Sequence, residues 1–153
     1  MKEIFEAFLG IFFIMLEMVT GMSVIAASIT AKNADANLSA YVAEIEESNF
    51  AKSVVAAVFE DAYNRGYDIT MVFYTESETG AMKTYSCSTS DLSPFKENNS
   101  DRWVINSSQL DNKFKNTGMT FADVYMIQIK LSFDYNFSLY NNVTPHVLYR
   151  FAR

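Results

Sequence analysis

The residues able to do chemistry are few and scattered in this chain of 153 residues. It has one cysteine, Cys87, and one histidine, His146, so a paired thiolate or imidazole metal site, a CxxC motif and a haem-attachment motif are all excluded. His146 has no acid and nucleophile near it in the sequence. The six aspartates after Gly66 lack the spacing of a calcium loop: Asp68, Asp91, Asp101, Asp111, Asp123 and Asp134. The sequence therefore predicts no catalytic residue, no cofactor and no metal ligand, and we expect a protein that is not an enzyme.

Charge and composition narrow the class of protein further. The chain has 18 acidic and 12 basic residues, which give a net charge of −6, and it lacks a local cluster of lysine and arginine. A phosphate-binding surface would have no electrostatic support, so we expect no nucleic-acid partner. With 50% apolar and 20% charged residues, the composition is that of one folded domain rather than a disordered or collagen-like chain.

The first 31 residues form an apolar segment in which charged side chains are rare. Between Ile4 and Ala31 only Glu6 and Glu17 are charged. Residues 7–27, AFLGIFFIMLEMVTGMSVIAA, are long enough as a helix, at about 1.5 Å per residue, to cross a hydrocarbon layer of roughly 30 Å. We therefore predict that residues 1–31 are a hydrophobic N-terminal helix for a membrane or a filament core.

A cleaved secretory signal is the alternative interpretation of this segment. The tripeptide at 34–36, Ala-Asp-Ala, satisfies the small-x-small rule for signal cleavage. Against a signal, Lys2 is offset at once by Glu3 and Glu6, the apolar run is longer than a signal core, and Glu17 interrupts it. The pattern therefore favours a retained helix.

The predicted helix continues beyond the apolar segment. No proline occurs before Pro94 and no glycine between Gly21 and Gly66, so we expect one helix from Glu3 to Arg65, on the order of 90 Å long. Its second half is amphipathic, with apolar residues at steps of three and four. They are Ala36, Leu38, Ala40, Tyr41, Ile45, Val54, Val55, Val58, Phe59 and Ala62.

Two features of the apolar half suggest contact with sister helices. Ser23, Ala27 and Ala31 form one stripe of small residues, which lets helix backbones approach closely, although ordinary alanine content would give the same pattern. Glu17 lies where a carboxylate in lipid is unfavourable, so it needs a partner or a role, unless it is protonated or faces water.

After Gly66 the periodicity changes from that of a helix to that of strands. Residues 32–153 are expected to hold the amphipathic helix continuation and a globular head, an α+β fold with an antiparallel sheet of four or five strands packed on the helix. Isoleucine, leucine and aromatic residues alternate with polar ones without exception over 127–139. The predicted strands are 67–75, 82–89, 103–107, 127–139 and 147–151, with turns at 76–80 and 141–142 and a loop at 90–102.

Five N-x-S/T triplets follow the apolar segment. The asparagines are Asn37, Asn98, Asn106, Asn136 and Asn142. They are acceptor sites for N-glycosylation, while a chain rich in Asn, Ser and Thr produces such triplets by chance as well. In either case they indicate a solvated surface.

The layout of the whole chain resembles the type IV pilin-like superfamily, and within it the tight-adherence pilins and TadE-like pseudopilins. The resemblance rests on Glu6-Ala7-Phe8-Leu9 with the apolar run to Gly21, on the polar-alanine helix AKNADANLSAYVAEIEE, and on the closing strand KLSFDYNFSL running into a proline. Phe5 stands where these pilins carry a glutamate at the fifth mature position, and a helix-bending proline near position 22 is missing. The numbering thus either follows the cleavage of a leader or starts at the translation start.

The resemblance implies a structural subunit of an extracellular pilus-like filament, with adhesion among the roles such filaments serve. The subunit would be inserted in the cytoplasmic membrane before assembly, and its partners would be copies of itself and the pilus assembly machinery. The alternative is a minor pseudopilin or a single-pass membrane-anchored accessory protein. In a filament, Glu6 would neutralise the α-amino group of a neighbour, or Glu17 would take that role. The assembly residues we expect are Glu3, Glu6, Glu17, Ser23, Ala27 and Ala31.

Overall fold

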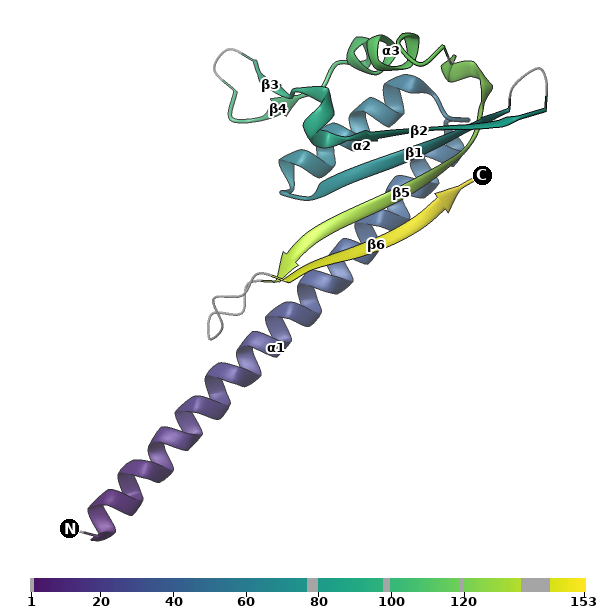
Figure 1. The fold of residues 1–153 in the computed structure, drawn as a ribbon. Helices are drawn as coiled ribbons and strands as arrows, with labels where there is room; N and C mark the ends of the chain where they lie inside the picture. The colour runs from purple at the N-terminus through teal and green to yellow at the C-terminus, as the bar shows by residue number, and fades with distance from the viewer. Residues whose placement is uncertain (1, 77–79, 98–99, 119, 136–143) are drawn as a thin grey trace.

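A long helix projects from a small head in the computed structural model of the chain (Figure 1). The structure describes residues 2–76, 80–97, 100–118, 120–135 and 144–153. The helices are α1 (Lys2–Glu47), α2 (Lys52–Asn64) and α3 (Ser107–Lys115), with short 3-10 turns η1 (Thr89–Leu92) and η2 (Phe121–Asp123). The strands are β1 (Asp68–Glu76), β2 (Met82–Ser88), β3 (Phe95–Lys96), β4 (Trp103–Val104), β5 (Val124–Tyr135) and β6 (Thr144–Ala152).

Helix α1 has two parts that differ in what surrounds them. In its C-terminal part, Ala34, Leu38, Tyr41 and Ile45 are buried at steps of three and four residues, because this stripe packs on β5 and β6. Before Ser23, every described side chain is exposed. The head is therefore built on the last third of α1, and the rest extends beyond it.

The prediction of one unbroken helix to Arg65 is wrong, because α1 ends at Glu47. The N–H of Phe50 donates to the carbonyl oxygen of Ile45 (3.0 Å), and that of Asn49 donates to the carbonyl oxygen of Glu46 (3.0 Å). This pair of bonds is a Schellman motif, with Asn49 in the left-handed position at φ 49°. Asparagine tolerates that conformation, so neither glycine nor proline is needed to end the helix.

Helix α2 turns back after this break and covers the same side of the sheet. Its residues Val55, Val58, Phe59 and Ala62 are buried, and the helix contacts β1, α1 and α3. Figure 1 shows α2 and the upper part of α1 on one side of the sheet. The break thus converts a helix that would have run past the head into a second helix of its core.

The sheet is antiparallel throughout, with the strand order β2-β1-β5-β6. Across its helix-facing side, Ile69 pairs with Leu131, Met71 with Ile129 and Phe73 with Ile127; all six side chains are fully buried. The α+β class, the long N-terminal helix and the four-stranded antiparallel sheet are confirmed. The last residues of the predicted strand 127–139 and the turn at 141–142 lie outside the described residues.

The connection from β2 to β5 is more structured than predicted. The expected loop 90–102 contains most of η1 and the strand β3, which pairs with β4. The predicted strand 103–107 is only two residues long, because Asn106 caps α3: its side chain accepts from the Ser108 N–H (3.1 Å), and the Gln109 side chain accepts from the Asn106 N–H (3.2 Å). Helix α3 is not among the predicted elements, although the spacing of Asn106 and Gln109 in the sequence is that of a capping box.

Candidate assembly surface

The part of α1 outside the head, residues 2–30, carries an extended exposed apolar surface, and we call this part the stem. Its large apolar side chains are 40–74% exposed and lie on all sides of the helix. They are Ile4, Phe5, Phe8, Leu9, Ile11, Phe12, Phe13, Ile14, Met15, Leu16, Met18, Val19, Met22, Val24, Ile25 and Ile29. A helix that is apolar all round is buried in lipid or among other helices.

The stem has the length and the composition of a membrane-spanning helix. Within the described part of the chain, α1 is the one helix long and apolar enough to cross a membrane, and none of its most apolar 18-residue window is buried. No described part of the head covers this window (Figure 1). The described residues therefore leave the apolar surface of the stem without a covering layer.

Three hydroxyl groups of the stem donate to backbone carbonyl oxygens within the helix, whereas the exposed Ser28 hydroxyl has no such bond. The Thr20 hydroxyl donates to the Leu16 carbonyl, that of Ser23 to Val19 (2.9 Å) and that of Thr30 to Ala26 (3.0 Å). A dry environment penalises unpaired polar groups, and these three hydrogen bonds reduce that penalty. The stem thus enters lipid or a helix bundle with few unmet polar atoms.

The stem also carries four charged residues, which are Lys2, Glu3, Glu6 and Glu17. Glu3, Glu6 and Glu17 are all exposed, and none lies within ion-pair distance of a described basic group. Glu3 lies in the first turn of α1, where the helix dipole favours a carboxylate. Glu17 is far from either end of the helix, so its carboxylate must be stabilised by a basic group of another molecule or by hydration.

The small-residue stripe lies on the side of the stem that faces the head. Ser23 and Ala27 are half-buried, and Ala31 packs against the core of the head. The stripe continues directly into the buried residues Ala34 and Leu38. Ala31 thus already has contacts within its own chain, while the assembly role predicted for Ser23 and Ala27 stays a prediction.

Polar contacts attach the part of α1 that follows the stem to the C-terminal strand. Arg150 of β6 forms an ion pair with Asp35 (2.9 Å), and the backbone N–H of Arg153 donates to the Glu46 carboxylate (2.9 Å). Together with the buried stripe of α1, these contacts hold β6 along the helix. They fix the direction in which the stem leaves the head.

A hydrogen-bonded cluster joins α1 to α2. The Tyr41 hydroxyl donates to Asp61 (2.7 Å), and Arg65 forms an ion pair with the same carboxylate oxygen (2.6 Å). Burial raises the pKa of Tyr41, and its bond to Asp61 raises it further. Burial acts to raise the pKa of Asp61, but the hydrogen bonds from Arg65 and Tyr41 outweigh it, so that pKa is lowered.

The sequence motifs of the head are dispersed over its surface. Asn37 is half-buried on α1 and donates to the Tyr67 hydroxyl (3.1 Å), whereas Asn106 is exposed and caps α3. The other three predicted glycosylation sites, Asn98, Asn136 and Asn142, lie outside the described residues.

The cysteine and the histidine lie apart in the head. Cys87 is fully buried in β2, and this burial raises the pKa of its thiol to about 11. His146 is on β6, where its ring stacks on Phe133 at 6.0 Å between centroids. Among the described residues no three His, Cys, Asp or Glu side chains converge in a way that could hold a metal ion.

Comparisons of the chain with protein-family models, curated proteins and solved structures found no match. The architecture described above, a long apolar N-terminal helix with a small antiparallel sheet, is the one that the resemblance to pilins implied.

Proposed function

We propose that this protein is a structural subunit of an extracellular pilus-like filament. The observation that carries the proposal is the stem, whose apolar side chains are exposed on all sides and three of whose hydroxyls donate within the helix. Such a helix is suited to lipid before assembly and to a bundle of sister stems afterwards. The head, attached at one end, would then face outward.

Assembly in this scheme exchanges one apolar environment for another. Lipid tails are as apolar as a neighbouring stem, so the hydrophobic effect alone does not drive the exchange. The favourable terms are close packing of helices and pairing of the stem carboxylates with basic groups of neighbours. An assembly machine in the membrane would supply the work of extraction.

The experiment is electron microscopy of material sheared from cells that produce the chain, with mass spectrometry of the same fraction. Filaments whose mass is dominated by this chain support the proposal, and the detected N-terminal residue reports whether a leader was removed. A chain that stays in the membrane fraction, with no filament containing it, contradicts the proposal and favours the alternative of a membrane-anchored accessory protein or a minor pseudopilin.

Oxidative crosslinking separates stem packing from head contacts. Ile14→Cys places a thiol on the stem, and Thr84→Cys places one on the exposed surface of β2 as the matched control. We expect dimers from Ile14→Cys in the filament fraction and far fewer from Thr84→Cys. The native Cys87 is fully buried and does not interfere.

A further inference from the structure

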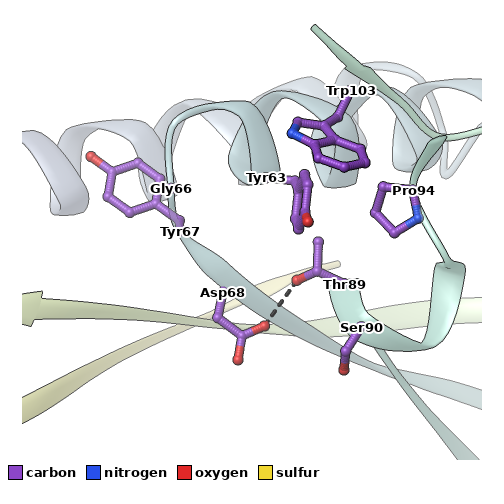
Figure 2. A pocket seen from close by; sticks show the side chains of 8 residues that line it. All are labelled: Tyr63, Gly66, Tyr67, Asp68, Thr89, Ser90, Pro94 and Trp103. Carbon is purple, nitrogen blue, oxygen red and sulfur yellow. Dashed lines mark hydrogen bonds between the residues drawn. The ribbon is translucent and has the colours of Figure 1, made fainter. Parts of the chain in front are cut away.

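The head carries an open hollow where the end of α2, the start of β1, η1 and β4 meet (Figure 2). Its volume is about 650 Å³, within the range of small-molecule sites, roughly 300–1,000 Å³. Ring side chains form one part of its lining and polar groups another. This combination is typical of a site that orients a ligand rather than of a simple packing defect.

Two aromatic rings and a proline form the apolar wall. Trp103 and Tyr63 meet at right angles with their centroids 5.5 Å apart, and Pro94 lies beside them (Figure 2). Trp103 is held in place by the side chain of Asn64, which accepts from its backbone N–H (2.8 Å) and donates to its backbone carbonyl oxygen (2.8 Å). The wall is thus fixed before any ligand arrives.

The polar side of the hollow contains a carboxylate with spare capacity. Asp68 accepts one hydrogen bond through Oδ1, from the hydroxyl of the buried Thr89 (2.9 Å). Its Oδ2 accepts none from a described residue, and the Asp68 side chain is exposed to solvent. A carboxylate held by one oxygen is a preoriented acceptor for the hydroxyl groups of a ligand.

We propose that this hollow binds a neutral sugar in its pyranose form. A pyranose presents a face of C–H groups that suits the rings of Trp103 and Tyr63, and a rim of hydroxyls that suits Asp68. An organic cation is disfavoured, because the Lys96 ammonium, 5.2 Å from the centroid of the Trp103 ring, would repel it. A wholly apolar ligand would leave the carboxylate desolvated and unpaired. The site belongs to the head and does not depend on filament assembly.

The probe is Trp103 itself, the one tryptophan of the chain. The full chain, held in a polyoxyethylene detergent that carries neither a sugar nor a quaternary ammonium, is titrated with glucose, galactose, mannose and N-acetylglucosamine. We expect a saturable change of tryptophan emission with at least one of them, with a Kd on the order of 1 mM. Sorbitol, which has the hydroxyls but no ring, should give no saturable change.

Substitutions assign the response to the two sides of the hollow. We expect Asp68→Asn and Tyr63→Leu each to weaken binding by about tenfold or more, and Asp123→Asn, on an exposed turn outside the hollow, to leave it unchanged. Far-UV circular dichroism checks that each variant is folded.

Several outcomes overturn the proposal. They are no response to any of the four sugars, an equal response to sorbitol, a response that survives both substitutions, or saturable binding of tetramethylammonium without binding of a sugar. Because the detergent-held subunit is used, these results are independent of whether filaments form.

Discussion

The hydroxyl of Tyr41 donates a 2.7 Å hydrogen bond to Asp61, and this bond joins α1, which carries the stem, to α2. Tyr41 is 4% exposed, so its hydroxyl has little access to water if this partner is lost. The bond therefore couples the orientation of the stem to the core of the head.

Removing this hydroxyl should destabilise the head. We expect Tyr41→Phe to lower the free energy of unfolding by about 1 kcal/mol, since the carboxylate it contacts is partly solvated and retains Arg65. Tyr149→Phe removes the same atom from an exposed ring on β6 and should change stability by less than about 0.5 kcal/mol. Urea unfolding of the detergent-held chain measures both; equal effects would contradict a role for the bond.

Low pH should reduce the stability of the head by protonating two carboxylates. Burial acts against ionisation of Asp61, but hydrogen bonds from Arg65 and Tyr41 lower its pKa, and hydrogen bonds from the Ser88 hydroxyl and N–H lower the pKa of Asp91. A lowered folded-state pKa contributes stability above the unfolded value of about 3.9, and this stability is lost as the pH falls through the folded-state pKa.

We therefore expect the urea concentration at the unfolding midpoint to decrease as the pH is lowered below about 4. The decrease should be less steep in Asp61→Asn, which has no carboxylate to protonate at this position. The control is Asp101→Asn, which removes an exposed carboxylate without an ion pair to a described residue. If Asp61→Asn and the unsubstituted chain lose stability in parallel, the cluster does not contribute to acid sensitivity.

The strands of the four-stranded sheet could be predicted because their burial pattern is local. In β5 the alternation of apolar and polar residues follows directly from a sheet with one face on helices and one in water. The end of α1 could not be predicted from glycine or proline, because the turn depends on Asn49 and on the packing of Phe50 against the core. The hollow of the head had no sequence signal either, since Tyr63 and Trp103 are brought together only by the Asn64 side chain and the fold.

The turn at Asn49 provides a direct test of the helix break. Its φ of 49° disfavours residues with a branched Cβ, so Asn49→Val should lower the free energy of unfolding by about 1–2 kcal/mol. Asn49→Gly should leave stability unchanged or raise it, because glycine adopts this conformation freely. The measurement is the urea unfolding midpoint of each variant. A Val variant as stable as the Gly variant would mean that the chain reverses elsewhere.

The thiol of Cys87 should be inert in the folded head. The side chain is fully buried, and burial raises its pKa to about 11, so thiolate is scarce at pH 8. We expect no measurable reaction with Ellman's reagent at pH 8, and reaction of one thiol per chain after unfolding in guanidinium. Rapid labelling of the folded chain, or a Cys87-linked dimer on non-reducing gels, would be inconsistent with this burial.

The charges of α1 predict how sister stems are staggered. Lys2 and Lys32 lie fifteen residues before and after Glu17, a distance of about 22 Å along the helix. A parallel neighbour displaced by that distance brings its Lys2 to the level of Glu17 and its Glu17 to the level of Lys32. One displacement therefore supplies a basic partner for every Glu17 in the bundle, which would otherwise remain uncompensated.

Charge reversal tests this stagger. Glu17→Lys should reduce the filament yield in the sheared fraction strongly, since an unpaired buried charge costs about 3–5 kcal/mol. Adding Lys2→Glu and Lys32→Glu to the same chain restores opposite charges at both levels and should recover filaments. Glu47→Lys, an exposed reversal at the head end of α1, is the control and should assemble normally. Failure of the triple variant, while the chain still inserts in the membrane and the control assembles, would show that Glu17 has another partner, because every charge needed for the fifteen-residue stagger is present in that variant.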